Sequence, residues 1–241
     1  MRSGPLSGRF WLVTLAALVA VAVTVALGFW QLSRAAEKLA LQDKMDSRQQ
    51  EAVLDGASLT EASVATDKLY RRAAVRGRWL PSHTVFLDNR QMNGKPGFFA
   101  VTPLQLEGST QVVLVQRGWV PRNFVDRAQV PDLPVETGVV ELQGRIAPPP
   151  SKLYDFDTSQ AGIIRQNLDL AQFSREIGRP LLQVSVLQSG PPGDGLLRDW
   201  PRVNVGVEKH HGYAFQWFAL GGLVTLLYGW FQIVRPYFPP R

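Results

Sequence analysis

Residues 10–30 read FWLVTLAALVAVAVTVALGFW and contain no Asp, Glu, Lys or Arg. At about 1.5 Å of rise per residue, a helix of this length crosses a hydrocarbon core of roughly 30 Å. Phe10 and Trp11 at one end, and Phe29 and Trp30 at the other, are rings of the kind that favour the membrane–water interface. The stretch therefore predicts a membrane-spanning helix near the start of the chain.

A cleaved signal peptide is the competing interpretation of this stretch. Residues 26–28 (Ala-Leu-Gly) have the small-x-small spacing that signal peptidases prefer. However, the apolar stretch is longer than the roughly 7–15 residues of a typical signal core, and two bulky rings follow the cleavage pattern directly. We therefore favour a retained anchor.

A second uncharged stretch, residues 213–234, is also long enough to span a bilayer, although Gln216 and Gln232 make its ends more polar. None of the 26 basic and 20 acidic residues falls in either stretch. The average hydropathy of the whole sequence therefore hides two membrane segments and one water-soluble body. We expect spans at 10–30 and 213–234, tails at 1–9 and 235–241, and a body at 31–212.

The charges predict how the chain is oriented in the membrane. The tails carry Arg2, Arg9, Arg235 and Arg241 and no acidic residue, whereas the body is close to neutral. Short basic tails mark the cytoplasmic side, and a loop as long as the body translocates largely regardless of its charge. We expect both termini in the cytoplasm and the body in the periplasm. A bacterial inner membrane is the expected location, because so short a leader cannot be a mitochondrial transit peptide.

The net charge of +6 does not indicate a nucleic-acid partner, because most of the excess lies in the tails. Catalytic motifs are also scarce. The chain has no Cys and only three His, and it contains no His-Glu-x-x-His, Gly-x-Ser-x-Gly or phosphate-loop motif. A disulfide framework, a Cys-ligated metal and a thiol nucleophile are excluded, and we expect no enzymatic activity.

The body is expected to be a helix followed by strands. Residues 31–55 are rich in helix formers and contain no Gly or Pro, which predicts a helix continuing out of the first span. Turn formers at Asn93-Gly94, Pro103 and Gly108 separate short apolar or alternating runs further on. These runs predict strands at residues 73–79, 84–88, 98–102, 111–117, 138–146 and 181–187.

One short helix is expected among the strands, with Asp169 as its N-cap, Leu170, Phe173 and Ile177 at helical spacing, and Gly178 at its end. The sequence therefore predicts a membrane-anchored α+β protein. Its two terminal membrane helices flank a β-rich domain, which is a mainly antiparallel sheet or a small barrel.

The polar segment that enters the second span carries the candidate ligand residues. In a helix, His210, Ala214, Trp217 and Gly221 share one face, with Tyr213 beside them. An imidazole above two small residues and flanked by large rings suits a flat apolar macrocycle, and His is a common axial ligand of haem iron. The alternative is an aromatic belt with a polar interfacial His, and composition alone favours that alternative.

Five short motifs follow one another along the chain: Arg71-Arg72-x-x-Val75-x-Gly77-x-Trp79, Gly97-x-x-x-Val101-Thr102-Pro103, Val113-Leu-Val-x-Arg117-Gly118-Trp119-Val120-Pro121, Asn167-Leu-Asp169-Leu170 through Gly178, and His210-x-x-Tyr213-Ala-x-Gln216-Trp217-Phe218 preceded by Asn204. With the two spans they cover nearly the whole sequence, which thereby resembles the Surfeit locus protein 1 family. It departs from the pattern at Glu208-Lys209, where some relatives have Asn immediately before the His.

Members of that family are assembly factors for haem-copper cytochrome c oxidase, anchored by two helices with a β-rich domain outside the membrane. The resemblance implies a role in inserting or guarding haem a while the catalytic subunit of the oxidase matures. The implied partners are that subunit, the haem a synthesis machinery and the lipid bilayer. The resemblance also implies that His210 ligates the haem iron, with Tyr213 and Trp217 flanking the ring.

A second hypothesis is a membrane scaffold that stabilises an apo-oxidase intermediate and never binds haem itself. Its basis is the small residues of the two spans, which permit close contact between helices. These residues are Ala16, Ala20, Ala22, Ala26, Gly221 and Gly222.

Overall fold

The computed structural model describes residues 8–60, 67–126, 129–153, 162–191, 194–200 and 206–235. The chain divides into two compact units, one formed by Met1–Asp43 with Arg202–Arg241 and the other by Lys44–Pro201. Three residues named above, Arg2, Asn204 and Arg241, lie outside the described residues.

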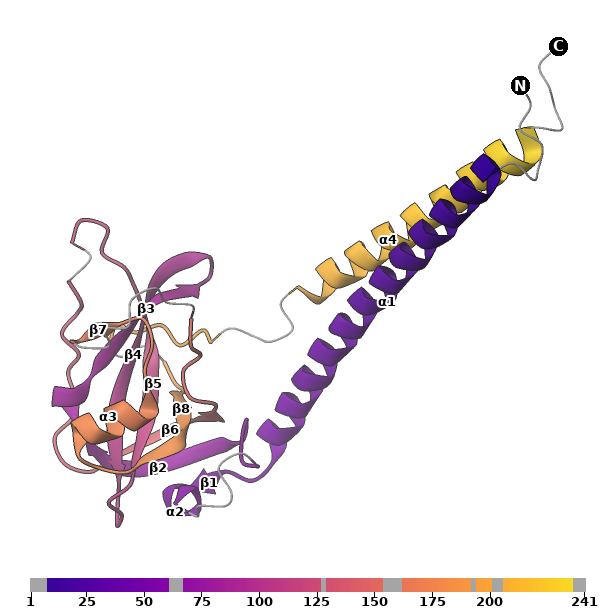
Figure 1. Cartoon of the computed structure of the whole chain (residues 1–241). Helices are drawn as coiled ribbons and strands as arrows, with labels where there is room; N and C mark the ends of the chain where they lie inside the picture. Colours follow the sequence, from indigo (N-terminus) through magenta and orange to yellow (C-terminus); the bar gives the residue numbers. More distant parts are fainter. Residues whose placement is uncertain are drawn as a thin grey trace. The chain divides into compact units, whose positions relative to one another are not determined.

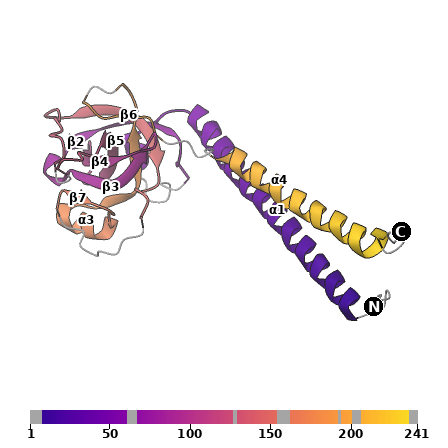
Figure 2. The same cartoon turned by 90° about the horizontal axis from the view of Figure 1, so that it is seen from above.

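Two long helices form the first unit. Helix α1 (Gly8–Gln50) is continuous over 43 residues, which confirms that the first span continues as a helix. Helix α4 (Val207–Tyr228) ends in a short π-helical segment, η2 (Gly229–Val234). Both are long and apolar enough to cross a membrane. They lie side by side and antiparallel, so that the start of α1 and η2 are at the same end of the pair (Figures 1 and 2).

The second unit is a five-stranded barrel with additions. Strands pair in the order β2 (Arg72–Trp79), β6 (Val140–Ala147), β8 (Leu181–Gln188), β5 (Val112–Pro121) and β4 (Lys95–Leu106). A further pairing of β2 with β4 closes the ring. Every pair in the ring is antiparallel except β5 with β8. The expectation of a small β-rich barrel is confirmed.

Several smaller elements extend this ring. Strand β3 (Val85–Met92) pairs antiparallel with β4 and continues the sheet outside the barrel. Two short strands that the sequence pattern did not reveal, β1 (Leu54–Asp55) and β7 (Ile164–Arg165), add parallel pairings to β2 and β3. Single turns of helix, α2 (Gly56–Leu59) and η1 (Pro81–His83), flank β2.

Strand β5 is buried on both of its faces, which explains its nearly continuous apolar sequence. Val113 and Val115 belong to the main hydrophobic cluster of the barrel, whereas Leu114 points to the opposite side and packs with Phe173 of α3 (Leu170–Ile177). The predicted caps of α3 are confirmed. The Asp169 carboxylate accepts a hydrogen bond from the Gln172 backbone N–H at 2.9 Å, which holds the pKa of Asp169 below its ordinary value.

Pro103 was expected to end a strand, and this expectation is wrong, because Pro103 lies inside β4. Its neighbour on one side is Leu114 of β5. On the other side β4 changes partner, from Val85 of β3, opposite Val101, to Trp79 of β2, opposite Leu104. The strand tolerates Pro103 because no ladder partner requires an N–H donor at that change.

Barrel closure depends on close approach of the backbone at Gly77. A Cβ atom at this position would lie 2.2 Å from the Gln105 carbonyl oxygen on β4, a distance that no side chain rotation can relieve. We predict that Gly77→Ala lowers the free energy of unfolding of the barrel by about 1–3 kcal/mol, measured by urea unfolding followed through tryptophan fluorescence. Gly56→Ala is the control, because a Cβ there is 3.7 Å from its nearest neighbour. Equal stability of the two variants would contradict this account of closure.

Candidate functional site

The candidate ligand His210 lies in the first turn of α4. The helix begins after Gly206, whose positive φ of 91° turns the chain into the helix. The His210 side chain is half-buried, whereas His211 is exposed. Successive helical residues point about 100° apart, so the two imidazoles do not converge on one ion.

The face of α4 that carries His210 packs against α1. Its covered positions recur at spacings of three and four residues, and the same spacing recurs along α1, as in antiparallel helices that pack along a seam. The covered positions on α4 include Val207, His210, Ala214, Trp217, Phe218, Gly221, Val224 and Tyr228, and those on α1 include Thr14, Ala17, Val21, Thr24, Gly28, Gln31 and Ala35.

Two glycines bring the helices close together along this seam. A Cβ on Gly221 would lie 2.9 Å from Thr24 Oγ1, and a Cβ on Gly28 would lie 2.6 Å from the Phe218 ring. Further along, the Thr14 and Tyr228 hydroxyls share a hydrogen bond of 2.7 Å. The small residues therefore serve contact between α1 and α4.

This packing corrects two expectations from the sequence. Ala214 and Gly221 were expected to form an open seat for a macrocycle, but they are buried, and Thr24 of α1 lies against Gly221. The small residues expected to permit close helix contact are only in part those of the seam. Gly221 is buried there and Ala20 is half-buried, whereas Ala16, Ala22, Ala26 and Gly222 are exposed.

His210 is held at the end of the seam by Gln31. The imidazole Nδ1 lies 2.7 Å from the Gln31 side-chain oxygen. An amide oxygen can only accept, so Nδ1 donates in this contact, and in the neutral imidazole Nε2 then keeps its lone pair. One hydrogen bond therefore fixes both the tautomer and the orientation of the ring, as the outer partners of metal-bound histidines do.

The two aromatic candidates differ in their surroundings. Tyr213 is 51% exposed, whereas Trp217 is half-buried at a seam position. Trp30, next to Gln31 on α1, is half exposed and lies under the Arg34 guanidinium at 5.7 Å. Amphipathic rings and basic groups at one level are typical of the membrane–water interface, which is where we expect His210.

A bare metal ion has no evident site among the described residues, since no group of three His, Cys, Asp or Glu side chains comes together there. A haem needs less from the protein, because its macrocycle already supplies the equatorial nitrogens and the protein adds axial ligands. One oriented imidazole beside apolar surface fits haem iron better than a free ion.

Gln31, which contacts His210, is the residue that reasoning from the sequence missed. It follows the first span directly, and His210 shortly precedes the second. If the two spans pair antiparallel, these polar ends meet at the same level. The signal was therefore the matched position of two polar residues at the ends of adjacent apolar stretches.

The motifs of the body are structural in the barrel. A Cβ on Gly97 would lie 2.5 Å from the Trp119 ring, and Trp119 donates its indole N–H to the Arg90 carbonyl at 2.9 Å. A Cβ on Gly118 would lie 2.6 Å from Leu196 Cβ. Arg71 forms an ion pair with Glu51 at 3.0 Å. These residues hold the fold, and none converges with His210 on a common site in the first unit.

The fold and the site define a class of membrane-anchored protein, with an antiparallel helix pair and a five-stranded mixed barrel. The sequence model of the SURF1 family matches residues 18–222. A SURF1-like protein of Rickettsia felis is 32% identical over 107 residues, 44% of this chain and 45% of that protein. One of Rickettsia prowazekii is 27% identical over 219 residues, 86% of this chain and 84% of that protein.

One relative, from yeast, has a name that states its function. The cytochrome oxidase assembly protein SHY1 of Saccharomyces cerevisiae is 26% identical over 99 residues, which are 41% of this chain and 25% of that protein. Because the family match covers most of the sequence, the chain belongs to the SURF1 family.

The two adjacent glycines of α4 give a test of the seam. We predict that Gly221→Leu, which would collide with Thr24, separates α1 from α4, whereas Gly222→Leu, which has open space, does not. The chain has no Cys, so a Cys pair replacing Thr14 and Tyr228 can be joined by a bifunctional thiol reagent that spans the length of the lost Tyr side chain, and the joining reports on the contact. This cross-linking should slow about tenfold with Gly221→Leu. Equal rates in both variants would refute the seam.

Proposed function

We propose that the protein assists assembly of cytochrome oxidase and holds haem a transiently through His210 before the cofactor reaches the catalytic subunit. Support for the oxidase comes from membership of the SURF1 family and from the yeast relative whose name states that role. Such a protein binds and hands over a cofactor, and no bond-making step is assigned to its own side chains.

The observation that carries the haem part of the proposal is the hydrogen bond between Gln31 and His210. It presents Nε2 as a free donor atom at the level where the apolar helices meet water. Iron would take that nitrogen, Tyr213 and Trp217 would flank the ring, and the apolar tail of haem a would lie in lipid. The apolar surface for that tail exists, since Phe215 is 74% exposed.

The same proposal places the protein in a bacterial inner membrane with both termini in the cytoplasm and the barrel in the periplasm. The antiparallel helix pair supports termini on one side. Retention of α1 is supported by its seam contacts, because removal at Gly28 would discard Thr14 and Thr24, which contact α4. Reporter fusions at each terminus and in the barrel test this orientation.

Deletion of the gene distinguishes the haem-delivery hypothesis from the hypothesis of a scaffold that does not bind haem. We predict that oxidase purified from a deletion strain contains less haem a per catalytic subunit, whereas its copper content falls less. Full haem a occupancy with a lower yield of oxidase would instead support the scaffold and remove haem delivery from the proposal. Haem a and copper per subunit are measured by pyridine haemochrome spectra and metal analysis.

Three substitutions test the ligand in the detergent-purified protein. We predict that His210→Ala abolishes copurified haem a, because Nε2 is lost. Gln31→Leu should lower haem retention by about tenfold and alter the Soret band, because the imidazole loses its fixed tautomer. Gln31→Glu, which keeps an acceptor, should retain haem at least as well as the parent. His211→Ala is the control, because that exposed side chain points elsewhere.

Haem content equal to the parent in His210→Ala would refute the ligand assignment. Loss with His210→Ala but no change with Gln31→Leu would keep the ligand and refute the orienting role of Gln31.

A further inference from the structure

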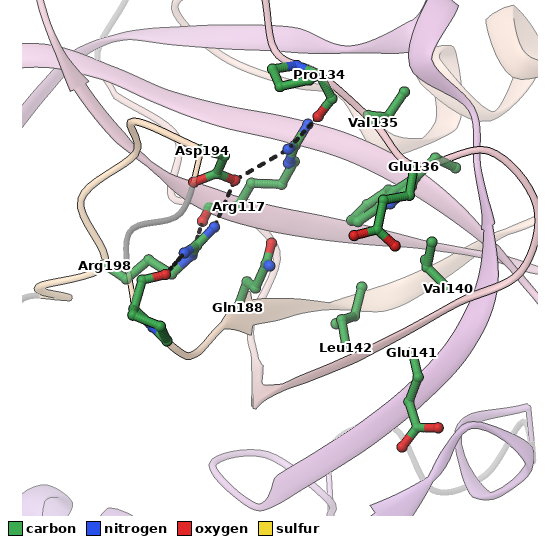
Figure 3. Close-up of a pocket in the computed structure, with 12 residues that line it drawn as sticks. Arg117, Pro134, Val135, Glu136, Val140, Glu141, Leu142, Gln188, Asp194 and Arg198 are labelled. Atoms are coloured by element: carbon green, nitrogen blue, oxygen red, sulfur yellow. Dashed lines mark hydrogen bonds and ion pairs between the residues drawn. The ribbon is translucent and has the colours of Figure 1, made fainter.

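A pocket of about 490 Å³ opens on the barrel, but its buried charges are paired within its own walls. Asp194 lies 3.2 Å from Arg117 and 2.7 Å from Arg198 (Figure 3). Arg117 also donates to the Pro134 carbonyl at 3.0 Å. The lining holds three carboxylates against two guanidinium groups, so it does not call for an anionic ligand. The first unit differs, because basic residues gather there on one side of the helix pair.

The seam between α1 and α4 has two edges, and one close contact marks each of them. On the first edge, a Cβ on Gly28 of α1 would lie 2.6 Å from the Phe218 ring of α4. On the second edge, the Lys38 ammonium of α1 lies 3.8 Å from the position that a Cβ on Gly206 would take. Residues of the two helices can therefore be assigned to one edge or the other from their helical spacing.

On α1, this spacing places Arg34 and Lys38 on the second edge. Successive helical residues turn by about 100°, so Lys38 lies about 20° and Arg34 about 60° from Gln31 in one direction around the helix. Gly28, which marks the first edge, lies about 60° from Gln31 in the opposite direction. Arg34 and Lys38 are also about one and two turns further along α1 than Gln31, away from the uncharged stretch.

On α4, the same spacing places Lys209 and Tyr213 on the second edge. Gly206, which marks this edge, lies about 40° from His210 in one direction. Tyr213 and Lys209 lie about 60° and 100° from His210 in that same direction. Phe218, which marks the first edge, lies about 80° from His210 in the other direction.

We call this second edge the basic edge, and its residues are Arg34, Lys38, Lys209 and Tyr213. Arg34 already pairs with Glu37 at 2.7 Å. Lys38 is half-buried and Lys209 is exposed. Glu208, the acidic neighbour of Lys209, lies about 160° from His210, on the far side of α4. The basic edge therefore carries one lysine from each helix beside the turn that holds His210.

The charges around His210 are arranged in one direction along the helix pair. Lys38 and Lys209 lie on the side of the Gln31–His210 contact that leads to the barrel sequence, whereas residues 10–30 and 213–234 on the other side contain no charged residue. Haem a is divided in the same way, because one edge of its ring carries two propionate carboxylates and another carries a long apolar tail. Carboxylates are costly in apolar surroundings and are stabilised by ammonium groups.

On the basis of the proposed function, we infer that Lys38 and Lys209 bind the two propionates of the haem a whose iron His210 ligates. The lysines then set the orientation of the ring, with its carboxylates at the basic edge and its tail along the uncharged helices. Each helix contributes one lysine, as each contributes one partner of the contact between Gln31 and His210.

The test compares haem a with its dimethyl ester, in which both propionate charges are removed. Each is titrated into the full-length protein in detergent, and binding is followed by the Soret band. We expect the free acid to bind about fivefold more tightly than the ester, as two partly exposed ion pairs allow. His210→Ala should abolish binding of both forms, because the iron ligand is common to them.

Substitution of the two lysines assigns the preference to the basic edge. Lys38→Gln combined with Lys209→Gln should bring the affinities for acid and ester together, with the Soret position unchanged because His210 is kept. Lys38→Arg combined with Lys209→Arg should keep the preference, because both charges are retained. Lys44→Gln is the matched control, since Lys44 is an exposed lysine further along α1 and should leave the preference unchanged.

Equal affinity of the parent for acid and ester would overturn the inference, whereas the proposed function would stand if both forms still require His210. A preference that survives the double Lys→Gln change would also overturn the inference. If the parent binds neither form, the proposed function fails and this inference fails with it. If the double variant does not fold, Lys209→Gln at its exposed position decides alone, and we expect it to lower the preference about twofold.

Discussion

Close contact between α1 and α4 at Gly28 and Gly221 is the constraint on which the membrane unit depends. Lipid tails are as apolar as the helices, so burial of apolar side chains does not drive helices together within a bilayer. Packing of small residues and hydrogen bonds supply that attraction instead. At Gly221 a Cβ would lie 2.9 Å from Thr24 Oγ1, and at one end Thr14 and Tyr228 share a hydrogen bond.

This constraint also sets what His210 can do. Antiparallel packing brings Gln31 and His210 to one level, although 179 positions separate them along the chain. The hydrogen bond that follows fixes the ring without help from the barrel. The first unit therefore forms the contact between Gln31 and His210 within its own two helices.

The elements were predictable from the sequence where the physical cause is local. The absence of charged residues over 10–30 predicted the first span, and the apolar or alternating runs predicted the six longer strands. Asp169 and Gly178 predicted the two ends of α3. Barrel closure was not predictable, because Gly77 and Leu106 are distant in sequence and only tertiary packing pairs them. The prediction that Pro103 ends a strand was wrong for the same reason, since β4 accommodates Pro103 only where it changes its partner strand.

The site shows the same division between local and tertiary causes. Helical spacing correctly placed His210, Ala214 and Gly221 on one face, but it could not reveal that α1 covers that face. Once α1 is present, the small residues no longer offer an open surface, and the available donor atom is Nε2 at the end of the seam. Which face of α4 carries a ligand therefore depends on its partner helix and not on its own periodicity.

If the protein holds and releases haem a as proposed, the choice of an amide as the partner of His210 matters. A carboxylate in place of Gln31 would draw the Nδ1 proton more strongly and make Nε2 a stronger donor to iron. A neutral amide fixes the ring with less effect on its basicity. Exchange between two proteins requires that neither site holds the cofactor far more tightly than the other, since transfer is governed by the difference in affinity. A single imidazole supported by Gln31, at a half-buried position, meets that requirement better than a closed pocket with a carboxylate-supported ligand would.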